Sequence, residues 1–250
     1  MATSASTCYT PGMRKWVTGA VLALVLVLVV ATGGYFLMNS RTYQLAGRLV
    51  DRVDTDEKVV ALTLDDGPSE RAPEVLALLA TAGIPATFYL NGRDLAARPD
   101  LGRAIVAAGH EIGNHTYTHR RMVLVSPETV ADEVEGTDSQ IRAAGYQGDI
   151  TFRPPYGKKL WALPNYLADH NRTTVTWDVE PEDGNTSTQD LVAAAVDQVR
   201  PGSIILLHTM YASGADARAA IVPIAAKLHA QGYRFVTVSE LLERAGSARP

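Results

Sequence analysis

The chain has 250 residues, of which 46% are hydrophobic and 20% are charged. This composition excludes a disordered or collagen-like chain and suits one globular domain with a short appendage. The formal net charge of −4 and the absence of clustered lysine and arginine argue against nucleic acid as a partner, because phosphate binding needs a basic surface.

The first element along the chain is an apolar segment over residues 16–39, which contains no charged residue. As a helix it is long enough to cross a hydrocarbon core of about 30 Å, whereas the apolar part of a signal peptide usually has about 7 to 15 residues. We therefore expect a single-pass anchor in the cell membrane, with residues 1–15 as a cytoplasmic tail and residues 40–57 as a spacer before an extracytoplasmic domain. The small residues from Ala31 to Gly34 leave a cleaved signal and a secreted domain as the alternative.

The only cysteine, Cys8, lies in the predicted tail. A single cysteine excludes an intrachain disulfide and a cysteine-based metal site, so any metal must be bound by His, Asp or Glu. Acylation of Cys8 near the membrane and a plain solvated thiol are both compatible with its position.

From residue 58 onward, short β-branched or aromatic runs alternate with Ala- and Leu-rich stretches of helical periodicity. The predicted strands are residues 59–64, 86–90, 111–114, 151–153, 173–177, 203–207 and 234–238. The predicted helices are residues 72–82, 94–108, 127–144 and 216–230. Glycines suited to the left-handed helix cap follow them: Gly83, Gly109, Gly145 and Gly232.

This alternation predicts an α/β domain with a parallel sheet over residues 58–245, followed by a C-terminal tail at 246–250. We favour a distorted (β/α) barrel of about seven strands, because each polar cluster described below follows a strand, as active-site residues do at the C-terminal rim of a barrel. An open doubly wound sheet is the alternative, although it would gather such residues mainly near a switch point.

Two adjacent carboxylates, Asp65 and Asp66, follow the first strand and precede Gly67 and Pro68. Asp, Gly and Pro are all common in turns. Adjacent carboxylates also repel each other, which favours a site where a cation or a base function uses them. This motif alone is compatible with either interpretation.

His115 and His119 follow the third strand and are four residues apart, so they would share one face if the segment were helical. The chain has six histidines, and this spacing suits one metal ion. Together with one aspartate they would leave open positions on the metal, which is typical of a catalytic site.

Three further polar clusters follow later strands. Arg153 begins an Arg-Pro-Pro-Tyr-Gly sequence whose prolines would stiffen a loop and hold the arginine in one pose, although a structural ion pair is the alternative. Residues 177–183 contain four carboxylates, most of them expected at the surface. His208 ends the sixth strand, where a buried structural histidine is the alternative.

Taken in this order, the five clusters resemble the five motifs of the polysaccharide deacetylase family, also called the NodB-homology domain or carbohydrate esterase family 4. The resemblance extends over roughly Lys58 to Glu243. It implies a metal-dependent hydrolase that removes N-acetyl groups from cell-wall polysaccharide such as peptidoglycan or chitin-like oligomers. The metal would be one divalent ion. Zn²⁺ is the expected ion, and Co²⁺, Mn²⁺ or Ni²⁺ are alternatives.

The resemblance implies a metal triad of Asp66, His115 and His119. It implies that Asp65 is the general base and that Arg153 orients Asp65 and keeps it ionised.

The remaining motifs imply four further roles. The backbone N–H of Tyr156 would contribute to the oxyanion hole, and Leu206 would line the pocket for the acetyl methyl group. His208 would be the general acid, and Asp183 would stabilise its protonated form.

The sequence departs from the family pattern at three positions. Leu64 stands where phenylalanine is common, and Ile205 stands where the fifth motif usually begins with leucine, but both remain apolar. Gly184 stands where a tryptophan usually follows the aspartate of the fourth motif, which weakens the substrate assignment and makes Glu180 a rival to Asp183.

Two other functions compete with N-deacetylation. The same residues would serve an O-acetyl esterase of the xylan type. A protein from another class, an inactive surface module that binds glycan, would be expected to lack a metal ligand or the base, and neither is missing here. No feature of the sequence specifies an oligomeric state.

Overall fold

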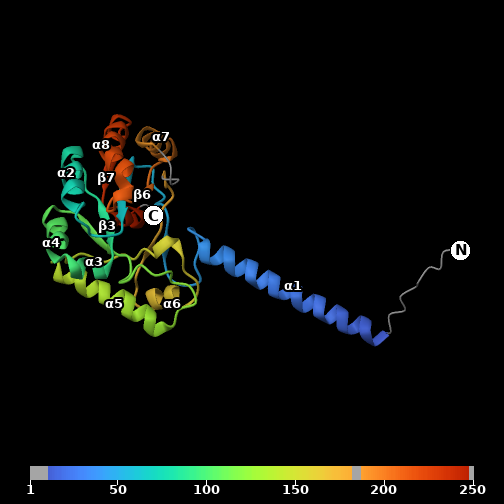
Figure 1. The fold of residues 1–250 in the computed structure, drawn as a ribbon. Coiled ribbons are helices and arrows are strands. Elements are labelled where there is room, and N and C mark those ends of the chain that lie inside the picture. Colours follow the sequence, from blue (N-terminus) through green and yellow to red (C-terminus); the bar gives the residue numbers. More distant parts are fainter. Residues whose placement is uncertain (1–10, 182–186, 248–250) are drawn as a thin grey trace.

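The computed structural model of the protein describes residues 11–181 and 187–247 (Figure 1). A long helix, α1 (Pro11–Asn39), projects away from an α/β domain. Within α1, Lys15–Asn39 forms a 25-residue span with a mean hydropathy of 2.5, and none of it is buried inside the structure. By length and composition this helix could cross a membrane, either as an anchor or as a signal sequence.

Parallel strands form the centre of the domain. They are β1 (Leu49–Val50), β2 (Val59–Asp65), β3 (Thr87–Leu90), β4 (Glu111–Asn114), β5 (Thr174–Val175), β6 (Ile204–Leu207) and β7 (Arg234–Val236). The main sheet has the order β4-β3-β2-β6, β7 also pairs with β2, and β1 pairs with β5. Isolated parallel bridges continue from Asn114 through Phe152 to Thr174, and from Val179 to Ile205. The strands therefore follow the course of a distorted (β/α) barrel that regular pairing does not close, and the predicted α/β fold is confirmed.

Helices surround these strands (Figure 1). They are α2 (Ala72–Ala82), α3 (Gly92–Ala97), α4 (Pro99–Ala107), α5 (Pro127–Ala143), α6 (Ala162–Asp169), α7 (Thr188–Gln198), α8 (Ala215–Ala230) and α9 (Val238–Ser247), with 3-10 turns η1 (Pro155–Gly157) and η2 (Ala212–Gly214). The four glycines that were expected to end helices all have positive φ angles, as a left-handed cap requires.

The helix expected over residues 94–108 is divided in two at Arg98. Arg98 has φ −138° and ψ 61°, outside the helical region, because the ring of Pro99 disfavours helical geometry in the residue before it. Helices α6, α7 and α9 have no counterpart among the helices expected from the sequence.

Strand β2 separates the two sides of the barrel wall by simple alternation. The even-numbered residues from Val60 to Leu64 pack against the surrounding helices. The odd-numbered residues Val59 and Ala61 belong to a separate interior cluster. Further along the strand, Thr63 and Asp65 share this inner face and are also buried. The strand therefore delivers one carboxylate to the barrel interior at its carboxyl end.

The end of α1 is bound to the domain through a loop next to η1. The backbone N–H of Lys159 donates to the carbonyl of Met38 at 3.3 Å. The ammonium groups of Lys158 and Lys159 donate to the Asn39 side chain and to the Ser40 carbonyl, respectively. Lys159 is almost fully buried, and this burial lowers its pKa to about 8.

The buried Lys159 predicts a pH-dependent stability. Below about pH 8 the amine is charged in both the folded and the unfolded chain, and its burial costs free energy. Between about pH 8 and its ordinary value of 10.5, the folded chain releases the proton first, so stability rises with pH. Urea unfolding of the full-length protein in mild detergent should show that wild type gains stability relative to Lys159→Met over this interval.

The control for this prediction is Lys227→Met, at an exposed position of α8. Its stability difference from wild type should stay flat over the same pH interval. A flat difference for Lys159→Met as well would contradict the prediction.

Candidate active site

Asp65 and Asp66 diverge at the end of β2. Asp65 is buried and points into the barrel, whereas the side chain of Asp66 is 13% exposed. Asp66 has a left-handed backbone with φ 76°, and its N–H donates to the carbonyl of Tyr89 at 3.0 Å. This bend directs two neighbouring carboxylates to different places, which relieves the repulsion that an extended pair would have.

His115 and His119 lie together although the segment that joins them is a loop. Thr116 and His119 both have positive φ angles, so the chain turns back on itself without forming a helix. The two imidazole rings have centroids 5.0 Å apart, and Nε2 of His119 lies 3.2 Å from Oδ1 of Asp66.

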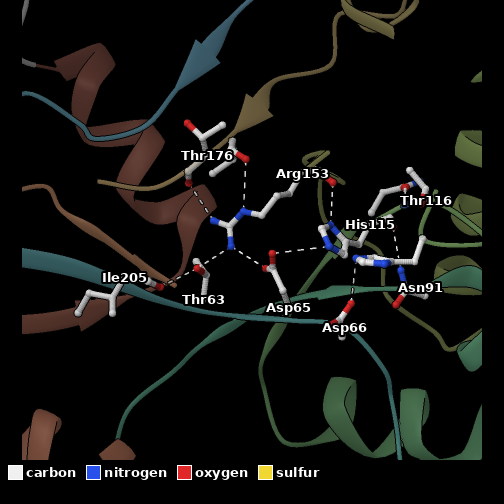
Figure 2. A network of polar contacts seen from close by, with 12 residues as sticks. Thr63, Asp65, Asp66, Asn91, His115, Thr116, Arg153, Thr176 and Ile205 are labelled. Carbon is white, nitrogen blue, oxygen red and sulfur yellow. Dashed lines mark hydrogen bonds and ion pairs between the residues drawn. The ribbon is translucent and has the colours of Figure 1, made fainter. Parts of the chain in front are cut away.

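The three side chains of Asp66, His115 and His119 form a candidate metal site, because each offers one ligand atom and these atoms all lie within 4.8 Å of one another. Nδ1 of His115 lies 2.8 Å from the carbonyl oxygen of Arg153 (Figure 2). A carbonyl only accepts, so Nδ1 carries the hydrogen and the lone pair is on Nε2. Burial lowers the pKa of His115, which favours the neutral imidazole that binds metals. The donor set therefore fits a divalent ion.

Arg153 is fully buried and holds Asp65 (Figure 2). Nη1 of Arg153 donates to Oδ1 of Asp65 and to Oγ1 of Thr63, both at 2.7 Å. The other nitrogens donate to the carbonyls of Val175 at 3.3 Å and Thr176 at 2.9 Å. A guanidinium with this many fixed acceptors cannot rotate away from the carboxylate.

The surroundings of Asp65 stabilise its ionised form. Burial by itself raises the pKa of this carboxyl, but the charge of Arg153 and its hydrogen bond to Asp65 lower the pKa below the ordinary value. Asp65 is therefore an anion at neutral pH. Nε2 of His115 lies 3.7 Å from Oδ2 of Asp65, so the carboxylate is next to the candidate metal site.

Tyr156 lies in η1 with a left-handed backbone, φ 60° and ψ 15°. Its side chain is exposed, and its ring centroid is 4.8 Å from that of His119. The guanidinium of Arg121 lies 4.7 Å from the centre of the same ring. Tyr156 is therefore at the solvent-facing edge of the site, and the role of its backbone N–H stays a prediction.

His208 and Leu206 approach the site from β6. His208 follows the strand, is half-buried, and lies close enough to Asp65 to interact with it electrostatically. Leu206 is paired with Thr63 in the register of β6 and β2, so the two side chains share the inner face of the barrel. Leu206 is buried in the interior cluster.

The fourth motif is only partly described. Asp183 and Gly184 lie outside the described residues. Glu180 is the alternative to Asp183. Its Oε2 atom accepts hydrogen bonds from Arg41 and from Nε1 of Trp177, each at 2.9 Å. These contacts direct Glu180 toward the end of α1.

Two residues that position the site, Thr63 and Asn91, were not predicted from the sequence. Thr63 accepts from Arg153 and donates to the carbonyl of Ile205 at 2.6 Å. Asn91, which follows β3, donates from its side chain to the carbonyl of His115 at 2.9 Å (Figure 2). A polar residue at an inward or terminal position of a buried strand was the available signal in both cases.

The comparisons agree with this geometry. The family model described as polysaccharide deacetylase matches residues 52–175. A peptidoglycan-N-acetylglucosamine deacetylase of Bacillus cereus is 34% identical over 201 residues, covering 78% of this chain and 93% of the relative. A chitooligosaccharide deacetylase of Sinorhizobium fredii is 39% identical over 166 residues, covering 64% of this chain and 76% of the relative. The solved structure of the Bc1960 peptidoglycan N-acetylglucosamine deacetylase has a TM-score of 0.73 and 30% identity, covering 76% of this chain and 91% of that chain.

The chain therefore belongs to the polysaccharide deacetylase family, carbohydrate esterase family 4, and is a hydrolase of that class. The expectations of family, α/β fold and enzyme class are confirmed.

The candidate metal site predicts different effects for two neighbouring substitutions. His115→Ala removes one of three ligands and should abolish both bound divalent metal and acetate release. Asp65→Asn keeps all three ligands and should lose activity by about 100-fold or more while it retains the metal. Elemental analysis of the purified proteins, together with acetate release, checks both. A metal content of His115→Ala equal to that of wild type would show that the ion binds elsewhere.

The buried ion pair predicts a large stability loss for Arg153→Met. This substitution leaves the Asp65 carboxylate buried without its cation and should cost about 3–5 kcal/mol. Arg103→Met breaks an exposed ion pair with Asp100 and should cost less than about 1 kcal/mol. Urea unfolding measures both. Equal losses would mean that Asp65 does not depend on Arg153.

Proposed function

We propose that the protein removes N-acetyl groups from N-acetylhexosamine-containing cell-wall polysaccharide, such as peptidoglycan or chitin-like oligomers. The observation that carries this proposal is the convergence of the Asp66, His115 and His119 ligand atoms next to the Asp65–Arg153 ion pair. The substrate class is supported by relatives whose names specify peptidoglycan and chitooligosaccharide deacetylation.

Asp66, His115 and His119 would hold one divalent ion. Two imidazole nitrogens and one carboxylate suit Zn²⁺ best, and Co²⁺, Mn²⁺ or Ni²⁺ could replace it. When bound, such an ion supplies Lewis-acid chemistry, which polarises a carbonyl and lowers the pKa of water. The hydrogen bond from His115 to the Arg153 carbonyl would keep the imidazole in the correct tautomer and orientation.

Asp65 is the proposed general base, because it is ionised, buried and fixed by Arg153. It would take a proton from the attacking water as the new carbon–oxygen bond forms at the acetamide carbonyl. The backbone N–H of Tyr156 would stabilise the resulting oxyanion. His208 would donate a proton to the nitrogen as the carbon–nitrogen bond breaks, which gives acetate and a free amine. Leu206 would contact the acetyl methyl group.

An O-acetyl ester of the xylan type would fit the same residues and differs in its leaving group. Without prior protonation, an ester would release an alkoxide and an amide would have to release a nitrogen anion, which is a far poorer leaving group. Ester cleavage therefore depends less on protonation by His208. The Asp183 partner proposed for His208 lies outside the described residues.

We further propose that α1 anchors the enzyme in the cell membrane with the deacetylase domain on the extracytoplasmic side. The apolar span and cell-wall-directed relatives support this location. Cleavage of α1 as a signal would give a secreted enzyme with the same site.

The proposal predicts metal-dependent release of acetate from purified peptidoglycan and chitin oligomers. A chelator should abolish the release, and added Zn²⁺ should restore it. His208→Ala should lower amide turnover by about 100-fold or more and lower ester turnover less.

Acetylated xylan is the matched control substrate. Activity on xylan alone would identify an O-acetyl esterase. Binding to all three polymers without acetate release from any of them would identify a glycan-binding module.

A further inference from the structure

Two exposed apolar side chains beside the end of α1 have no role in the proposed chemistry. Leu124 is 90% exposed and Trp161 is 68% exposed. A parallel bridge between Met122 and Lys159 aligns the two segments that carry them, and each side chain follows its bridge residue by two positions. The segments that carry Leu124 and Trp161 therefore run side by side at this bridge, and we refer to these two residues as the apolar wedge.

The wedge is exposed although its surroundings are packed. Met122 is buried in a small core with Leu163, and Val125 packs partly against the same core. Leu124, between them in sequence, has a left-handed backbone with φ 52°. A branched apolar residue rarely adopts this conformation, and full exposure to water offers no packing in return. The strained backbone and the exposure of Leu124 therefore have no explanation within the domain itself.

The position of the wedge indicates its partner. Lys159, two residues before Trp161, is hydrogen-bonded through its N–H to Met38 in the last turn of α1. Tyr35 and Phe36, exposed one turn earlier, are residue types that gather where a transmembrane helix leaves the hydrocarbon. At about 1.5 Å per residue along the helix axis, this level lies within roughly 5 Å of the loop that carries Trp161. Figure 1 shows α6, which begins directly after Trp161, on the side of the domain near the end of α1.

The chemistry of the wedge fits a lipid surface. Trp161 combines an apolar ring with one N–H donor, as in membrane-interface tryptophans. Leu124 has neither a hydrogen-bonding group nor a flat ring face to offer a sugar. Arg120 and Arg121 precede Leu124 in the same loop and are exposed. Their positive charge would attract anionic headgroups.

We propose that Leu124 and Trp161 insert into the headgroup boundary of the leaflet next to the domain and form a second membrane contact beside α1. The loop with Trp161 continues from η1, so this contact fixes the height and tilt of the active-site rim above the lipid. The enzyme would then act on glycan close to the membrane surface. The inference rests on the proposed anchoring by α1.

The test uses the full-length protein in nanodiscs of phosphatidylcholine and phosphatidylglycerol. Cys8, the only cysteine, is replaced by Ser, and an environment-sensitive fluorophore is attached to Leu124→Cys, Trp161→Cys or Ala80→Cys. Ala80 is the matched control, because it is exposed on α2, on the side of the domain away from α1 (Figure 1). Lipids with a nitroxide close to the headgroup serve as the quencher.

Quenching at positions 124 and 161 should exceed that at position 80 by at least about twofold, with a blue-shifted emission. Equal quenching at all three positions, in protein that still co-elutes with the nanodiscs, would overturn the wedge while leaving the anchor intact. A response of positions 124 and 161 to chitooligosaccharide and none to the quencher would also overturn it and indicate a sugar subsite. Acetate release from the same samples reports separately on the proposed function.

Discussion

The structure of the site depends on one buried ion pair, between Arg153 and Asp65. Both charges lie in the barrel interior, where either alone would be costly, and each offsets the cost of the other. Thr63 and two backbone carbonyls fix the guanidinium, which makes the position of the carboxylate equally fixed. The backbone of Arg153 also accepts from His115. One residue thus connects the proposed base with a proposed metal ligand.

The rim of the barrel extends this arrangement across three strands. β2 ends in the two aspartates, β4 is followed by the two histidines, and β3 lies between them. Asn91, directly after β3, donates from its backbone to Gly67 at 2.9 Å and from its side chain to the carbonyl of His115. Asn91 therefore connects the loop after β2 with the loop after β4, and the candidate metal site lies between these two loops.

The same loops that shape the site also contact the end of α1. The segment after η1 binds the helix end through Lys158 and Lys159. The segment after β5 binds it through Thr176, whose hydroxyl donates to the carbonyl of Arg41 at 2.6 Å, while Arg153 bonds the carbonyl of Thr176. The end of α1 and the loops around the site are thereby held together, so the proposed lipid contact would also set the orientation of the site.

The sequence by itself determined the apolar span, the alternation of strands and helices, and the order of the motifs, because these follow from periodicity and residue type along a local stretch. It also predicted that His115 and His119 would serve one metal ion, on one face if the segment were helical; in the structure, two left-handed residues in a loop bring them together. Only the tertiary structure decided that Thr63 and Asn91 support the site and that the end of α1 lies against it. These contacts join residues far apart in the chain, so a local pattern can mark the polar residue but cannot give its partner.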